Sequence, residues 1–255
     1  MFKKLVFAGC LSLLAFTGVS QAKETYVAGA GGTYRPFEFE NSEKQLEGFD
    51  IDIIKAVAAA EDFDVKLINT PWEGIFATLS AGDRDILISG ITITDKRKQM
   101  VDFSAPYFPA EQAIVVNENS PISALSELSK YNVGVVNSST GDIVVSDVLG
   151  KTSTAIKRFD NTPLLLQELY EDGVDAAVGD VGVVKFYIKT HPDKKFKLIY
   201  DNHFEKQYFG IAVAKGNTEL QEKINRGLAK IIADGTYAKI YQKWFDNDVP
   251  SLPAQ

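Results

Sequence analysis

The segment Ser89–Arg97, with the sequence SGITITDKR, decides how the rest of the chain is interpreted. It follows the apolar run Ile86–Ile88, which predicts a buried strand, and it leads into a polar segment that contains suitable helix-capping residues. A site at the carboxyl end of that strand is therefore expected. The turn offers backbone donors and the Thr92 hydroxyl, and Arg97 can present its guanidinium group to a planar carboxylate. This chemistry suits a small carboxylic acid, although a solvated arginine in a first helical turn also explains these residues taken alone.

The residues that follow carry a resemblance to a known family. Gln99–Tyr107, with the sequence QMVDFSAPY, completes a block that resembles the family 3 solute-binding proteins, the extracytoplasmic receptors of polar amino-acid ABC transporters. Gly48–Asp52 (GFDID) and Asp234–Phe245 (DGTYAKIYQKWF) also resemble this family, so the similarity spans roughly Tyr26–Asp248. The chain resembles glutamine-, histidine- and lysine-arginine-ornithine-binding proteins in particular.

The resemblance implies an α/β protein with the two-lobed periplasmic-binding-protein type II fold, a ligand in the cleft between the lobes and a two-segment hinge. Lobe 1 is then discontinuous, with residues 23–108 and the return segment 207–255, and lobe 2 is residues 109–206. The hinge segments are expected near Tyr107–Glu111 and Phe204–Tyr208. Ligand binding stabilises the closed state because both lobes contact the ligand only when closed. A membrane ABC permease is the partner that reads this closure.

The resemblance also implies which charged residues hold the ligand. Arg97 grips the α-carboxylate of the amino acid, and Asp180, at the end of the predicted buried strand Gly173–Asp180, receives the α-ammonium group. For Asp180, capping of the following helix is the alternative. The turn beside Arg97 adds three expected ligand-binding residues, which are Ser89, Gly90 and Thr92.

Two aromatic residues are expected to cover the ligand. Tyr34 lies in the loop Gly29–Phe39, where clustered Gly and Pro residues interrupt regular structure without the glycine spacing of a dinucleotide-binding motif. The family places a ring over the ligand at the position of Tyr34 and turns the aromatic residue at the position of Trp72 toward the cleft. Packing in the core is the alternative for both rings, and it is the expected place of Phe37.

A second turn supplies the lobe 2 side of the site. The apolar strand Val133–Val136 breaks into small polar residues before a helix, so its backbone N–H groups can hold a carboxylate. Ser, Thr and Gly also form plain turns, which is the alternative. Because the family's second-lobe turn aligns here, Asn137, Thr140 and Gly141 are expected to bind the ligand.

Strands and helices alternate from Tyr26 to Ile88 in the order β-α-β-α-β, which predicts a largely parallel sheet. Ile51, Ile54, Val57 and Ala58 recur at helical spacing and are expected in the core. The acids near the start of this helix are explained by the helix dipole. They lack the spacing of a Ca²⁺ loop and nearby histidines, so neither a metal site nor a cofactor is expected.

The N-terminus predicts a signal peptide over residues 1–22. Met1–Lys4 is basic, Leu5–Val19 is apolar and Ser20–Ala22 provides small residues for cleavage after Ala22. A retained anchor is the alternative, but the apolar run is shorter than the ~20 residues that span a bilayer. Lipid attachment at Cys10 is a second alternative, and it is disfavoured because the apolar run continues past the cysteine. The predicted location is the periplasm.

Removal of residues 1–22 leaves 233 of the 255 residues, with 25 basic and 34 acidic side chains and a net charge of −9, because Lys3 and Lys4 leave with the segment. This acidity makes nucleic acid an unsuitable partner. The remaining chain has no cysteine, which excludes disulfides and thiolate chemistry. We expect a monomer with ample apolar content for its core.

Three functional classes are consistent with this fold, and a transport binding protein is the expected one. A cyclohexadienyl-dehydratase-like enzyme is an alternative, because Glu73 or Glu111 can be imagined as its general acid or base. A ligand-sensing module is another. The sequence has no Ser-His or Cys-His arrangement, and its histidines, His191 and His203, lie in polar segments, so no catalytic residue is predicted.

The first loop bears on which amino acid is bound. Family members that bind lysine, arginine, histidine or glutamine commonly have an acid three residues before the ring, and that position is Gly31 here. Asn137 offers a donor and an acceptor to a neutral polar side chain. Glutamine is therefore expected first, and basic amino acids next if Glu111 or Asp142 replaces the missing acid.

Overall fold

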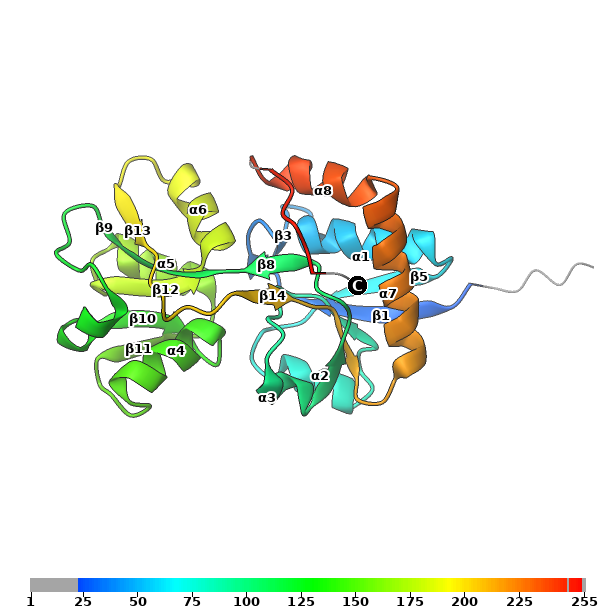
Figure 1. Cartoon of the computed structure of the whole chain (residues 1–255), viewed down its shortest axis with the longest axis horizontal. Helices are drawn as coiled ribbons and strands as arrows, with labels where there is room; N and C mark the ends of the chain where they lie inside the picture. The colour runs from blue at the N-terminus through cyan, green and yellow to red at the C-terminus, as the bar shows by residue number, and fades with distance from the viewer. Residues whose placement is uncertain (1–22, 247, 254–255) are drawn as a thin grey trace, which may run out of the picture.

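The computed structural model of the chain describes residues 23–246 and 248–253. The predicted signal peptide and Cys10 lie outside these residues. Figure 1 shows two bodies, each built around its own sheet, with the strands β8 and β14 running between them. Within the described residues, no helix combines the length and the apolar character that crossing a membrane requires.

The sheet of lobe 1 has five strands in the order β5-β1-β6-β15-β7. β5, β1 and β6 are parallel, as the sequence predicts, whereas β15 runs antiparallel to both of its neighbours. The strands are β1 (Thr25–Ala30), β5 (Asp64–Asn69), β6 (Ile86–Leu87), β7 (Val101–Phe103) and β15 (Ala212–Ala214). The helices are α1 (Phe49–Ala60), α2 (Ile75–Ser80), α3 (Asp95–Lys98), α7 (Thr218–Ala233) and α8 (Thr236–Trp244). A small sheet adds β2 (Thr33–Tyr34), β3 (Glu38–Glu40) and β4 (Leu46–Glu47).

Lobe 2 has a second five-stranded sheet, in the order β11-β10-β12-β9-β13. β9 runs antiparallel to β12 and β13, and β10 runs parallel to β11 and β12. The strands are β9 (Gln112–Asn117), β10 (Val133–Val136), β11 (Ile156–Phe159), β12 (Ala176–Asp180) and β13 (Phe196–Ile199). The helices are α4 (Thr140–Leu149), α5 (Thr162–Tyr170), α6 (Val181–Thr190) and the 3-10 helix η1 (Leu125–Lys130).

Two short strands join the lobes. β8 (Phe108–Ala110) and β14 (Gln207–Phe209) pair antiparallel in a sheet of their own (Figure 1). β8 lies within the expected hinge segment Tyr107–Glu111, and β14 overlaps the expected segment Phe204–Tyr208 but extends past it to Phe209. The segment Gln207–Val213 at the start of the return segment does not form one continuous strand. The chain leaves β14 at Gly210, whose N–H donates to the Ile91 carbonyl at 3.0 Å, and then enters the lobe 1 sheet as β15. The predicted lobe boundaries stay a prediction.

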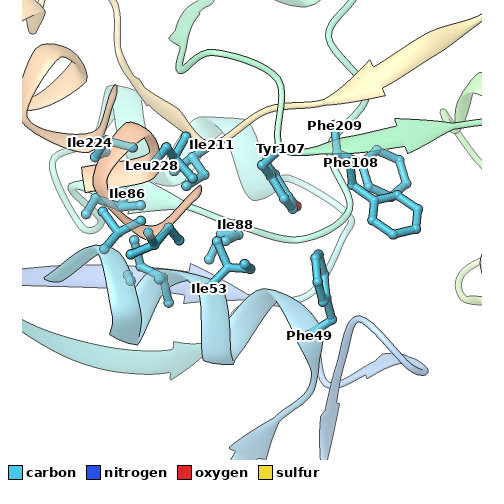
Figure 2. Close-up of a cluster of buried hydrophobic side chains, with 14 of the residues drawn as sticks. Phe49, Ile53, Ile86, Ile88, Tyr107, Phe108, Phe209, Ile211, Ile224 and Leu228 are labelled. Atoms are coloured by element: carbon cyan, nitrogen blue, oxygen red, sulfur yellow. The ribbon is translucent and has the colours of Figure 1, made fainter. Parts of the chain in front are cut away.

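The main core fills the space between the lobe 1 sheet and its helices. Figure 2 shows Ile53 and Ile224 on facing helices, with Ile88 on the sheet side and the rings of Phe108 and Phe209 at one end. The predicted helical core positions are all buried. Phe37 is fully buried, as expected, with its ring centroid 4.8 Å from that of Phe108 and 5.3 Å from that of Phe209. The strands that join the lobes are thus anchored in the aromatic end of the lobe 1 core.

Helix α1 begins at a position that only glycine can occupy without strain. Gly48 has φ +137°, and a Cβ built there would lie 2.1 Å from the Phe37 carbonyl oxygen. The close approach also lets the Asp50 N–H donate to that carbonyl at 2.9 Å. Gly48 therefore fixes the first turn of α1 against the loop that carries Tyr34 and Phe37.

We expect Gly48→Ala to lower the free energy of unfolding by about 3 kcal/mol or more, because it combines backbone strain with a backbone clash. Gly216→Ala is the matched control, since Gly216 has φ +84° but no atom within 4 Å of the position that a Cβ would take. The control should lose only about 1–2 kcal/mol. Urea unfolding measures both, and equal losses would contradict the role of the Phe37 contact.

Candidate functional site

One cavity of about 440 Å³ is lined by residues of both lobes, at the carboxyl ends of β1, β6, β10 and β12. This volume is in the range of small-molecule sites. It contains every residue that the sequence predicted for the site except Asn137 and Gly141. The lining residues among the predictions are Tyr34, Trp72, Ser89, Gly90, Thr92, Arg97, Thr140 and Asp180.

Arg97 brings a buried positive charge to the cavity. Thr94 caps α3 by accepting from the Arg97 N–H at 3.2 Å, which fixes the direction of the side chain. The guanidinium group donates to the Thr92 carbonyl at 2.9 Å and, across the cleft, to the Ser138 carbonyl at 3.4 Å. Burial lowers the pKa of Arg97 to about 10, so the group stays protonated at neutral pH. None of the ion pairs within residues 23–246 and 248–253 includes it.

Trp72 and Tyr34 lie at the cavity from lobe 1. The Arg97 guanidinium carbon is 5.1 Å from the centroid of the Trp72 ring, and the Trp72 indole N–H donates to the Asn137 carbonyl of lobe 2 at 3.0 Å. Tyr34 sits against Gly90, whose φ of +52° and missing side chain let the ring approach. The Tyr34 hydroxyl donates to Asp180 of lobe 2. Two hydrogen bonds therefore join these aromatic side chains to the opposite lobe.

Asp180, which is partly buried, brings a negative charge from the end of β12. It occupies the N-cap position of α6, but its side chain makes no capping hydrogen bond, which argues against the capping alternative. Oδ2 accepts from the Tyr34 hydroxyl, and Oδ1 accepts from Nε2 of Gln112 at 2.6 Å. Burial raises the pKa of Asp180 to about 6, so the group is mostly ionised at pH 7.

Gln112 is a cavity residue that the sequence did not predict. It stands directly opposite Asp180 in the antiparallel pair β9–β12. This pairing depends on the order of the strands in the sheet, and no local sequence motif around Gln112 predicts it.

The lobe 2 turn is built as an anion-binding corner. Ser138 has φ +60°, and its N–H donates to Asp142 Oδ2 at 3.0 Å. The Ser139 hydroxyl accepts from the Asp142 N–H at 3.1 Å and caps α4. Thr140, the first residue of α4, lines the cavity. The helix N-terminus and the Thr140 hydroxyl can therefore both meet a carboxylate.

The structure does not bring Asn137 and Gly141 to the cavity. Asn137 is exposed, and only its carbonyl takes part, as the acceptor for Trp72. The left-handed backbone at Ser138 redirects the chain, so the Asn137 amide does not line the space where a ligand side chain would lie. Gly141 packs instead against β12, where a side-chain carbon would approach the Val178 carbonyl oxygen to 3.0 Å.

The acids at the cavity differ from those considered from the sequence. Asp142 pairs with Arg158 at 2.9 Å and does not line the cavity, and Glu111 lines a separate cavity of about 390 Å³. Glu73 of lobe 1 and Asp160 of lobe 2 do line it, and both are exposed. The cavity has glycine at position 31, where related proteins commonly have an acid, but it has two other carboxylates in its lining.

Two buried acids support the Ser89–Gly90 turn, and the sequence assigned neither to the site. The Ser89 hydroxyl donates to Glu38 at 2.7 Å and accepts from the Gly31 N–H at 3.0 Å. The Gly90 N–H donates to Asp50 at 2.7 Å. The helix dipole is therefore an incomplete explanation of Asp50, because its carboxylate accepts a hydrogen bond from the wall of the cavity.

In the described part of the chain, no group of three or more His, Cys, Asp or Glu side chains is placed to hold a metal ion. The polar groups of the cavity are instead one guanidinium, several carboxyls, hydroxyls and the three amides of Asn69, Gln112 and Asn161. Such a set matches an organic zwitterion, with Arg97 and Asp180 as the two opposite charges.

Comparison with known proteins connects this site to a family. A probable histidine-binding protein of Neisseria gonorrhoeae is 40% identical over 87% of this chain and 83% of its own length. ABC transporter arginine-binding protein 1 of Escherichia coli K12 is 32% identical over 95% of this chain and 99% of its own. The solved arginine-, lysine-, histidine-binding protein ArtJ of Geobacillus stearothermophilus superposes with a TM-score of 0.85 at 38% identity, over 89% of this chain and 97% of that one. The family model of the bacterial extracellular solute-binding proteins, family 3, matches residues 26–247, and the chain belongs to that family.

Proposed function

We propose that this protein captures an L-α-amino acid in the cavity between its lobes and delivers it to an ABC permease. The observation that carries the proposal is the pair Arg97 and Asp180. They are opposite charges from different lobes that line the same cavity and are not paired with each other; Arg97 is buried and Asp180 is partly buried. A zwitterion satisfies both, because its carboxylate matches the guanidinium group and its ammonium group matches the carboxylate.

The surrounding groups extend this assignment. Thr92, Thr140 and the N-terminus of α4 complete the carboxylate site around Arg97, and Ser89 and Gly90 border it from lobe 1. Tyr34 and Trp72 cover the aliphatic part of the ligand from either side. The same contacts explain closure, because a ligand held by Arg97 and Asp180 bridges the lobes about the β8–β14 hinge.

The lining of the cavity favours a basic ligand side chain. Glu73 and Asp160 each bring an exposed carboxylate to this lining, one from each lobe, and no hydrogen bond joins either of them to another described residue. The relatives named above are histidine- and arginine-binding proteins, which supports the same preference. Glutamine, the first expectation from Gly31, becomes the second candidate, because the Asn137 amide that favoured it does not line the cavity.

The role is that of a transport receptor in the periplasm. It is supported by the predicted signal peptide, by the family and by a relative named for an ABC transporter. We propose a monomer that releases its ligand unchanged, since the cavity groups match the ground-state charges of a zwitterion. A dehydratase-like enzyme and a sensing module remain the competing functions.

The ligand preference is tested by competition calorimetry with arginine, histidine, lysine, glutamine and glutamate. We expect a basic amino acid to bind at least tenfold more tightly than glutamine. Glu73→Gln and Asp160→Asn should each weaken its binding by about 1 kcal/mol, as for partly exposed charges, and leave glutamine unaffected. Glu219→Gln, an exposed acid at the start of α7, is the control. Tighter glutamine binding would restore the prediction from Gly31.

The two opposite charges are tested by Arg97→Ala and Asp180→Ala. Each should weaken the best-binding amino acid of the panel by about 2–5 kcal/mol, because one ligand charge is left desolvated and unpaired. Lys98→Ala removes an exposed cation from the same short helix and is the matched control. Binding by Arg97→Ala within threefold of the wild type would refute the carboxylate assignment.

Release of an unchanged ligand is tested by incubating the protein with the bound amino acid and with prephenate-like cyclohexadienyl acids. Mass spectrometry should recover each compound in the amount added. Repeated turnover of any of them would favour the enzyme, and Glu73→Gln would then show whether that acid takes part.

A further inference from the structure

Two buried carboxyl groups lie side by side beneath the Ser89–Gly90 turn. Glu38 is 1% exposed and Asp50 is 0% exposed. Glu38 Oε1 accepts from the Ser89 hydroxyl at 2.7 Å, and Asp50 Oδ2 accepts from the Gly90 N–H at 2.7 Å. The remaining oxygens, Glu38 Oε2 and Asp50 Oδ1, are buried and have no hydrogen-bond donor among the described residues.

One shared proton resolves this arrangement. The donors from which the two carboxyl groups accept belong to consecutive residues, Ser89 and Gly90, which brings the carboxyl groups close together, and each group acts on the pKa of the other. Two adjacent buried carboxylates would repel each other without solvation, whereas a carboxylic acid beside a carboxylate makes a strong charge-assisted hydrogen bond. A proton between Glu38 Oε2 and Asp50 Oδ1 gives both unpaired oxygens a partner.

The surroundings decide which group keeps the proton. Asp50 Oδ2 also accepts from the Tyr107 hydroxyl at 2.9 Å, so its negative charge has two donors besides Glu38. Glu38 has one donor and faces a second negative charge across the cleft, Asp180. Burial raises the pKa of Glu38 well above its usual value and that of Asp50 to about 6. Glu38 is therefore the acid of the pair.

Neighbouring elements offer nothing that would neutralise a second charge. Within the described residues, the titratable groups acting on the pair from β2, β12 and the segment before β8 are Tyr34, Asp180 and Tyr107. The Tyr237 hydroxyl of α8 donates to the Tyr107 carbonyl at 2.8 Å, and the Arg97 charge acts on Asp180 and Tyr34. Tyrosines and an acid cannot balance a second carboxylate.

We propose that Glu38 and Asp50 share a single proton at neutral pH, and that this carboxyl pair positions the Ser89–Gly90 turn for ligand binding. The pair ties the turn to β3 and to α1, so it acts on the ligand through the turn. The Ser89 hydroxyl also accepts from the Gly31 N–H, and Gly90 contacts the Tyr34 ring. The loop that carries Gly31 and Tyr34 therefore depends on the carboxyl pair as well.

This arrangement gives the ligand affinity an alkaline limit. As pH rises past the pKa of Glu38, the pair becomes two carboxylates, the turn loses its geometry, and affinity falls by up to about tenfold per pH unit. The acidic limit has a different origin, because Asp180 and Asp50, each with a pKa of about 6, take up protons as pH falls, and Asp180 then no longer holds the ammonium group. The alkaline side of the profile is therefore the part that reports on the proton of Glu38.

Infrared spectroscopy tests the proton directly. At neutral pH the wild type should show a carbonyl stretch of a buried carboxylic acid, which disappears in Glu38→Gln and, for the wild type, at alkaline pH. Glu40→Gln, a partly exposed glutamate of the same strand, is the matched control and should retain the band. The absence of this band in the wild type overturns the proposal, whether or not Glu38→Gln folds.

Calorimetry with L-arginine and L-glutamine across the same pH range tests the positioning role. The Glu38→Gln amide can still donate to Asp50, so it should bind within about threefold of the wild type at neutral pH and lack the steeper alkaline fall. Deprotonation of the ligand amine affects all variants equally. A Glu38→Gln profile identical to the wild type at high pH overturns the role. This readout rests on the proposed function. Binding of none of the five amino acids of the competition panel would refute that function, while the infrared band still decides the pair.

Discussion

Keeping two opposite charges apart in the cleft is the constraint on which this structure depends. On lobe 1, the Arg97 guanidinium group donates to the Thr92 carbonyl. At the edge of lobe 2, the Asp180 carboxylate accepts from Gln112 of its own lobe and from Tyr34 of lobe 1. A buried charge without a partner costs several kcal/mol, and an ion pair between the two would remove that cost along with the capacity to bind. Neutral partners take the place of such an ion pair, a carbonyl for the guanidinium group and an amide and a hydroxyl for the carboxylate. The folded protein thus carries the electrostatic cost of two unpaired charges in the cleft, and a zwitterionic ligand offsets that cost when it binds.

Much of the fold could be predicted because its signals are local. Helical spacing in Ile51–Ala58 and the apolar run before Ser89 indicate buried elements without knowledge of their neighbours. The return segment was harder. Gln207–Val213 is uniformly suited to a strand, and only the competing partners β8 and β6 divide it at Gly210. When two different sheets pair with parts of one apolar segment, the periodicity of the sequence alone cannot show where one strand ends and the next begins.

In the site, too, the residues with local sequence signals could be predicted and those that depend on distant partners could not. Residues that end a strand or begin a helix, such as Arg97, Thr140 and Asp180, could be placed because the carboxyl ends of strands converge at one edge of a sheet. Gln112 and Glu38 could not be placed. Gln112 meets Asp180 through strand pairing, and Glu38 meets Ser89 through a side-chain hydrogen bond between residues 51 positions apart. The Asn137 side chain does not line the cavity, and the left-handed backbone that follows it is at a serine, which favours no such conformation by itself.

The hydrogen bond from Trp72 to the Asn137 carbonyl joins the lobes with no ligand atom between them. A bond of this kind contributes about 1 kcal/mol, or roughly a fivefold bias toward the closed form, whether the cavity is full or empty. In the transport role proposed above, an empty protein would therefore visit the shape that a permease recognises as loaded. Unloaded protein would compete for the docking site, and the selectivity of uptake would be limited by how far the ligand outweighs the direct hydrogen bonds between the lobes from Trp72, Tyr34 and Arg97.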